Sequence, residues 1–131
     1  MNKQEQFIHI NKYGTKQYYA DRKMTIPHRE DGPAIECTSG YKWWFINGKF
    51  HHEDGPAIEC ANGYKVWYIN GTCHREDGPA VEYPDGYKEW WLNGEHLTEE
   101  EFNARMNPVE LTLDEIAKKF GVSVDKLKIK K

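Results

Sequence analysis

The sequence repeats itself every 23 residues through more than half of its 131-residue length. Three consecutive copies begin at His28, His51 and His74 and read HREDGPAIECTSGYKWWFINGKF, HHEDGPAIECANGYKVWYINGTC and HREDGPAVEYPDGYKEWWLNGEH. A repeat of this length is one supersecondary unit, which buries its apolar side chains only by stacking on its neighbours. We therefore expect a row of equivalent units rather than a fold built around one central core.

Each copy contains two chain reversals on either side of an aromatic segment. The tripeptides TSG, ANG and PDG precede the segments at residues 41–46, 64–69 and 87–92, and Asn-Gly follows each segment. Asn-Gly favours the primed two-residue turn, in which both central residues have positive φ. The segments are aromatic and β-branched runs of strand length. The predicted fold is mainly β: an antiparallel meander of stacked β-hairpin repeats with a small α-helical C-terminal cap.

The first reversal also predicts the strand register. A three-residue loop with a glycine bulge at residues 84–86 places Glu82 opposite Lys88, whereas a two-residue turn shifts the pairing by one residue; we prefer the first. The same register pairs Glu59 with Lys65 and Glu36 with Lys42. Each exposed pair stabilises the fold by only roughly a few tenths of a kcal/mol, so the main effect of the pairs is to set the register.

Side-chain alternation divides each aromatic segment between two faces of the sheet. We expect one face to supply most of the core through stacked columns of Trp44, Trp67 and Trp90 with Ile46, Ile69 and Leu92. The other face carries what we call the aromatic row: Tyr41, Phe45, Tyr64, Tyr68, Tyr87 and Trp91. Its middle column varies as Trp43, Val66 and Glu89, which is typical of a face partly open to solvent or a partner. We predict that the row binds a partner; the alternative is that it packs on the terminal segments.

Three polar corners read His28-Glu30-Asp31, His52-Glu53-Asp54 and His74-Glu76-Asp77. We interpret Asp31, Asp54 and Asp77 as turn caps, the following glycines as positive-φ residues and the prolines as starts of the next strand. Catalysis needs asymmetric surroundings, which a threefold motif lacks, so we expect no enzyme, catalytic residue or cofactor. The aspartates are not set in the dense carboxylate loop that Ca²⁺ sites use, and Cys73-His74 has no second cysteine pair to complete a zinc site. We therefore expect no metal.

Residues 1–27 form an N-terminal strand and an irregular cap repeat, with Lys16 and Tyr18 at the positions of Lys42 and Trp44. Their opening lacks the apolar run of a signal peptide. The three cysteines are odd in number and fit a reducing compartment: Cys37, Cys60 and Cys73. We expect the protein in the cytoplasm.

The three repeats occupy residues 28–97. Residues 98–131 differ from them in composition and have no such repeat. TEEEFNARM starts a helix that ends before Pro108, and a second helix runs from the N-cap Thr112 to Gly121. The stretch from Leu113 to Ile129 resembles a helix-turn-helix, whose groove-facing candidates are Ser123, Asp125, Lys126, Lys128 and Lys130. Two other interpretations are a helix and short strand that cap the sheet, and a helical surface for a protein partner.

Charge separates the two parts of the chain. Residues 114–131 hold six lysines and three acids, a charge of +3, so the remainder carries −6 of the total of −3. Only the tail is attractive to phosphates.

The pattern of Tyr41, Phe45, Asn47-Gly48, His51 and Gly63 resembles the MORN repeat, also a 23-residue hairpin unit. Departures are Trp43, His52 and Asp54, where that family has other residues. The Glu-Asp-Gly-Pro-Ala corner is similar to variant arrays in small bacteriophage and bacterial proteins. The resemblance implies a scaffold that binds proteins or membrane lipids; 12 acids against six bases between His28 and Leu97 disfavour the membrane.

The sequence therefore predicts a non-enzymatic binding module. We expect a small, phage-encoded accessory protein that binds or inhibits a host protein in the host cytoplasm through the aromatic row and the acidic corners. One alternative is a nucleic-acid-associated regulator that uses the lysine tail. Another is a sponge that traps a nucleotide signal between protomers, with histidine and aromatic columns as walls. The oligomeric state stays open.

Overall fold

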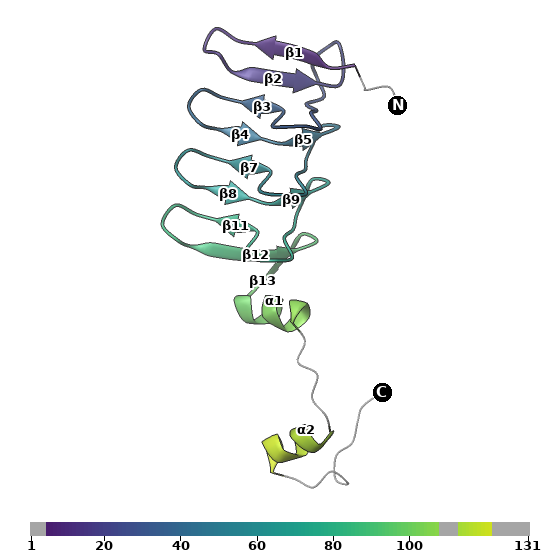
Figure 1. Ribbon diagram of the computed structural model, residues 1–131, viewed down its shortest axis with the longest axis vertical. Coiled ribbons are helices and arrows are strands. Elements are labelled where there is room, and N and C mark those ends of the chain that lie inside the picture. Colours follow the sequence, from purple (N-terminus) through teal and green to yellow (C-terminus); the bar gives the residue numbers. More distant parts are fainter. Residues whose placement is uncertain (1–4, 108–112, 122–131) are drawn as a thin grey trace.

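The computed structural model describes residues 5–107 and 113–121, and its centre is one antiparallel sheet of nine strands (Figure 1). The strands follow chain order across the sheet: β1 (Phe7–Ile10), β2 (Lys16–Tyr19), β3 (Ile35–Glu36), β4 (Lys42–Trp43), β7 (Ile58–Glu59), β8 (Lys65–Val66), β11 (Val81–Glu82), β12 (Lys88–Leu92) and β13 (Glu95–Leu97). Two small hairpins stand beside it: β5 (Phe45–Ile46) with β6 (Lys49–Phe50), and β9 (Tyr68–Ile69) with β10 (Thr72–Cys73). The predicted mainly β meander is confirmed.

The turns have the predicted backbone conformations. In each Asn-Gly pair both residues have positive φ, as at Asn47 (47°) and Gly48 (80°). The glycine that ends each three-residue loop is also left-handed, with φ of 98° at Gly40 and 91° at Gly86. These positions need Asn or Gly, because other side chains clash with the backbone at positive φ.

Opposite charges alternate across seven strands at the outer end of the hairpins. The aligned residues are Lys16, Glu36, Lys42, Glu59, Lys65, Glu82 and Lys88. This alignment confirms the register predicted from the glycine bulge. A slip of one residue would place lysines in the neighbouring apolar row, which contains Ile35, Trp43, Ile58, Val66 and Val81.

The most deeply buried side chains are alanines, not the tryptophans that we expected. Ala34, Ala57 and Ala80 are 0% exposed, and no large side chain among the described residues is fully buried. The Ala57 N–H donates to Val66 of its own repeat at 2.8 Å, and its carbonyl accepts from Trp44 of the preceding repeat at 2.7 Å. The alanine is thus hydrogen-bonded on both sides at the junction of two repeats, while Trp44, Trp67 and Trp90 are half-buried.

The middle column of the aromatic face is also deeper than predicted. Val66 is 4% exposed, whereas Trp43 and Glu89 are half-buried, so only the central member of the column is closed to solvent. Its cross-strand neighbours explain the burial, because Val66 lies between the apolar Ile58 and Val81.

The irregular first repeat makes the junction contacts of a full one. The Tyr18 N–H donates to Ala34 at 2.7 Å, just as the Trp44 N–H donates to Ala57. Lys16 lies opposite Glu36, as Lys42 lies opposite Glu59. An Asp21 turn replaces the Asn-Gly hairpin, with the Asp21 carboxylate accepting from the Thr25 and Ile26 N–H groups.

Helix α1 (Glu99–Met106) covers the C-terminal end of the sheet (Figure 1). Thr98 and Glu101 form a capping box at its start, as the sequence predicts for a helix that begins with threonine and acids. Phe102 is buried against Leu92 and Leu97, and Trp90 and Met106 pack around this cluster. Arg105 forms a double ion pair with Glu95 at 2.9 and 3.0 Å, which lowers the pKa of Glu95.

Helix α2 (Leu113–Phe120) forms where predicted, and Gly121 follows it with φ of 67°. The predicted cap Thr112 and the helix-turn-helix candidates Ser123, Asp125, Lys126, Lys128 and Lys130 lie outside the described residues. The nucleic-acid interpretation of this segment stays a prediction.

Enlarging a buried alanine should destabilise the stack. We expect Ala57→Thr to lower the free energy of unfolding by about 1–3 kcal/mol, because the added atoms have no space between two bonded repeats. Urea unfolding followed by tryptophan fluorescence measures the change.

Ala61→Thr is the matched control, since Ala61 is exposed and copy one has Thr38 at the equivalent loop position. Equal stability of the two variants would contradict the role given to Ala57.

Candidate functional site

Each repeat opens with a polar segment that we name corner 1 (residues 28–33), corner 2 (residues 51–56) and corner 3 (residues 74–79). The first residue of each corner is a histidine whose Nδ1 accepts a backbone N–H of the next Asn-Gly turn. The three bonds are Asn47 to His28, Asn70 to His51 and Asn93 to His74, each at 2.9 Å. These bonds place the ring proton on Nε2, which lies 3.4–3.7 Å from Glu30, Glu53 or Glu76.

This pattern corrects the predicted composition of the second corner. The residue equivalent to His28 and His74 is His51, whereas we predicted His52 at that position. His52 belongs to the next column, which contains Arg29 and Arg75. Two adjacent histidines made the alignment of the corner ambiguous in sequence.

The second residue of each corner covers an aromatic ring of the preceding repeat. Arg29 lies over Tyr18 with a centroid distance of 4.1 Å, and Arg75 lies over Trp67 at 3.9 Å. His52 stacks on Trp44 at 4.6 Å with an interplanar angle of 6°. Trp44 and Trp67 are therefore covered by the corner of the following repeat, and not by the next tryptophan.

The same three side chains donate to the corner proline carbonyl. The distances are 3.2 Å from Arg29 to Pro33, 2.9 Å from His52 to Pro56 and 3.0 Å from Arg75 to Pro79. In corner 2, His52 thus makes two of the contacts that arginine makes in corners 1 and 3: it covers the aromatic ring of the preceding repeat, and it donates to the proline carbonyl.

The corner glycines serve close packing rather than an unusual turn. Gly32, Gly55 and Gly78 do not have the positive φ that we predicted. A Cβ on Gly32 would lie 2.8 Å from Cζ of Arg29, and one on Gly78 would lie 3.0 Å from Cζ of Arg75. The second corner residue therefore lies directly against the glycine backbone, and a side chain at the glycine would displace it.

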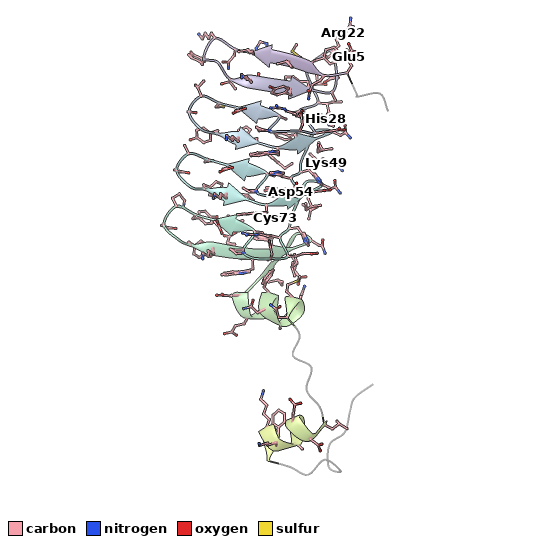
Figure 2. All side chains as sticks on the ribbon, viewed as in Figure 1. Glu5, Arg22, His28, Lys49, Asp54 and Cys73 are labelled. Carbon is pink, nitrogen blue, oxygen red and sulfur yellow. The ribbon has the colours of Figure 1, made fainter. Side chains whose placement is uncertain are left out.

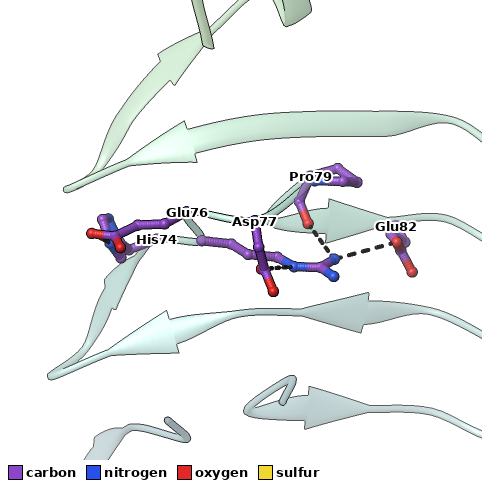
Figure 3. A network of polar contacts seen from close by, with 6 residues as sticks. His74, Glu76, Asp77, Pro79 and Glu82 are labelled. Carbon is purple, nitrogen blue, oxygen red and sulfur yellow. Dashed lines mark hydrogen bonds and ion pairs between the residues drawn. The ribbon is translucent and has the colours of Figure 1, made fainter. Parts of the chain in front are cut away.

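Two of the corner aspartates bind arginine. Arg29 Nε donates to Asp31 at 3.1 Å, and Arg75 Nε donates to Asp77 at 2.9 Å (Figure 3). The bond from Arg75 lowers the pKa of Asp77. We expected these aspartates to cap their turns; the arginine in the adjacent column gives them a side-chain partner.

Successive corners enclose two grooves. The groove between corners 1 and 2 is about 560 Å³, and its lining includes Trp44 and Ile46. The groove between corners 2 and 3 is about 750 Å³, and its lining includes Trp67 and Ile69. Four carboxylates and one arginine line each groove, so both are acidic. Asp54 lines both, together with Asp31 in the first and Asp77 in the second.

The predicted aromatic row is present, but much of it is packed within the protein. Tyr41 and Tyr87 are 42% and 57% exposed, whereas the other four members are half-buried. Rings outside the row connect its members: Phe50 stacks on Phe45 and Tyr68, Tyr83 contacts Tyr64 and Tyr87, and His96 stacks on Trp91. We did not predict these linking rings from the sequence, although Phe50 and His96 occupy the same position of the repeat.

A hydrogen-bonded carboxylate lies within the aromatic face of the third repeat. Glu89 accepts from Trp91 Nε1 at 3.0 Å and from the Tyr83 hydroxyl at 3.4 Å. Burial, with a smaller contribution from the Glu89 charge, raises the pKa of Cys73 to about 11. The Cys73 thiol is therefore neutral at physiological pH and packs as a small apolar group.

Among the described residues, no three histidine, cysteine or acidic side chains lie together as a metal site requires. In the same part of the chain, no helix has the length and apolar character needed to cross a bilayer. A comparison with family models, curated proteins and solved structures finds no match to the chain. The resemblance to the MORN repeat, the phage source and the cytoplasmic location stay predictions.

Removing a corner histidine should weaken the turn that it anchors. His28 is 5% exposed, and His28→Phe leaves the Asn47 N–H without its acceptor. We expect the free energy of unfolding to fall by about 1–3 kcal/mol in urea titrations. His9→Phe, at an exposed position of β1, is the control and should change stability little. A stable His28→Phe protein would contradict the anchoring role.

The Cys73 thiol should react slowly in the folded protein. In a Cys37→Ser, Cys60→Ser background at pH 8, its pKa of about 11 leaves roughly a hundredth or less of the thiolate present in the unfolded chain. We expect iodoacetamide to modify it about 100-fold more slowly in buffer than in urea. Equal rates would show that the thiol is neither buried nor perturbed.

Proposed function

We propose that the protein is a non-enzymatic binding module that engages a partner protein through the aromatic row and the acidic corners. The observation that supports this most is that the row recurs in all three repeats, with most of its rings held by neighbouring rings. Ring contacts hold its half-buried members in place, while Tyr41 and Tyr87 stay exposed at its two ends. Tyrosine and tryptophan held in fixed positions lose little side-chain freedom on binding, which favours affinity.

The corner histidines favour binding over catalysis. In His28, His51 and His74 the Nδ1 atom already accepts a backbone N–H. A general base needs a free nitrogen beside a reacting group, and it needs surroundings that distinguish one copy from the others. These histidines are committed to the turns instead.

The chemistry of the partner follows from the charge of the surface. Both grooves are acidic, and the lining of each includes an indole and an isoleucine. Such a surface favours a protein segment that presents cationic and apolar side chains together. We include the host-protein partner, the phage source and the cytoplasmic location in the proposal on the resemblance alone. Within the described residues, no observation favours the nucleic-acid or nucleotide-sponge alternatives.

The exposed tyrosines provide the test. Affinity capture from cells with mass-spectrometric identification gives the partner, and calorimetry with purified partner gives its Kd. We expect Tyr41→Ala and Tyr87→Ala each to weaken binding about tenfold or more, because tyrosine truncations at an interface cost about 1–2 kcal/mol or more.

Tyr13→Ala is the matched control, because Tyr13 is 70% exposed and lies outside the row. Tyr68 is unsuitable, since its ring packs on Phe50 and its loss would disturb the fold. Unchanged affinity of both row variants would count against the proposal.

A further inference from the structure

Corner 2 differs from the other two corners in the residue that covers the preceding aromatic ring. Corners 1 and 3 use Arg29 and Arg75, whereas corner 2 uses His52. Asp54 lies part-way along the stack, between His28 and Cys73 (Figure 2). The three corners are otherwise nearly identical in sequence, so corners 1 and 3 show which contacts an arginine makes at this place.

The arginines of corners 1 and 3 share three contacts, and Arg75 also donates to Glu82 at 3.5 Å. In corner 3, Arg75 lies over Trp67, donates to the Pro79 carbonyl at 3.0 Å and donates to Asp77 at 2.9 Å (Figure 3). In corner 1, Arg29 makes the equivalent contacts with Tyr18, Pro33 and Asp31.

His52 reproduces only the first two of these contacts. Its ring lies over Trp44, and its Nδ1–H donates to the Pro56 carbonyl at 2.9 Å. Within the described ranges 5–107 and 113–121, Asp54 has neither a hydrogen bond nor an ion pair to another side chain. In corner 2 the His52 imidazole therefore occupies the place of the guanidinium, and the Asp54 carboxylate beside it lacks the arginine partner that Asp31 and Asp77 have.

Corner 2 is also the corner that both grooves share. His52, Glu53 and Asp54 line the groove on each side. Corners 1 and 3 each carry one arginine against two acids, a formal charge of −1, whereas corner 2 carries two acids and no arginine, a formal charge of −2. A cation that approaches along either groove meets this excess charge beside an indole.

We propose that corner 2 binds the guanidinium group of an arginine from the partner protein, with Asp54 accepting its hydrogen bonds as Asp31 and Asp77 accept those of the internal arginines. This deepens the proposed function, on which its biological role rests. Arginine fits better than lysine because its planar fork bonds a carboxylate through two N–H groups and stacks on flat rings such as His52.

The direct test is an NMR titration of the full chain with N-acetyl-arginine amide, using N-acetyl-lysine amide as the comparison ligand. We expect arginine amide to shift the backbone signals of residues 52–56 and the indole signal of Trp44, with lysine amide at least several-fold weaker. The internal arginines already occupy corners 1 and 3, so residues 29–33 and 75–79 should shift less.

Two variants separate the site from general acidity. His52→Arg fills corner 2 from within, as in the other corners, and should abolish the shifts at residues 53–56 while the melting temperature stays the same or rises. Asp54→Asn should weaken binding at least fivefold. Asp77→Asn removes the same charge from a corner that holds its own arginine, and should leave the affinity at corner 2 within about twofold.

The inference is overturned if His52→Arg binds arginine amide as the parent does, if lysine amide binds equally well, or if the three corners shift equally. These results do not depend on a partner. If His52→Arg keeps full affinity for the partner while Tyr41→Ala loses it, the arginine site is wrong and the proposed function stands. If arginine amide binds as expected but the tyrosine variants keep full partner affinity, the arginine site stands and the proposed function is wrong.

Discussion

The fold depends on one aromatic residue in each repeat, which joins it to the next repeat in two ways. The backbone N–H of Tyr18, Trp44 and Trp67 donates to the buried alanine carbonyl of the following repeat at 2.7–2.8 Å. The rings of the same residues are covered by Arg29, His52 and Arg75 of that repeat. Hydrogen bonds that are shielded from water by such a side chain are stronger than exposed ones. Repeats therefore bind their nearest neighbours, as expected of a quasi-one-dimensional stack.

Because the contacts are made between neighbours, the two ends of the stack need different solutions. At the C-terminal end, Trp90 has no following corner, and Phe102 and Met106 of α1 supply the missing apolar cover. At the N-terminal end, Ile8 and Ile10 of β1 are 53% and 59% exposed. The inner repeats use small alanines and polar corners in place of a wide core, which explains why most aromatic side chains are only half-buried.

The sequence was sufficient to predict what is decided within one repeat. Asn47-Gly48 and its equivalents require a primed turn, the glycine bulge aligns Glu36 with Lys42, and Thr98 with Glu101 starts a helix. It was insufficient where the deciding contact comes from another repeat. Strand alternation places Trp44 on one face of the sheet, but it does not show that His52 of the next repeat covers the ring. The sequence also does not show that Arg29 lies against the backbone of Gly32.

The most direct test of this account is amide hydrogen exchange measured by NMR on the intact protein. The account predicts that the amide protons of Tyr18, Trp44 and Trp67 exchange among the slowest in the protein and open with similar free energies, since each one joins two repeats. Rapid exchange of these three amides, with opening free energies near zero while the hairpins stay protected, would show that the repeats are not held together at these junctions.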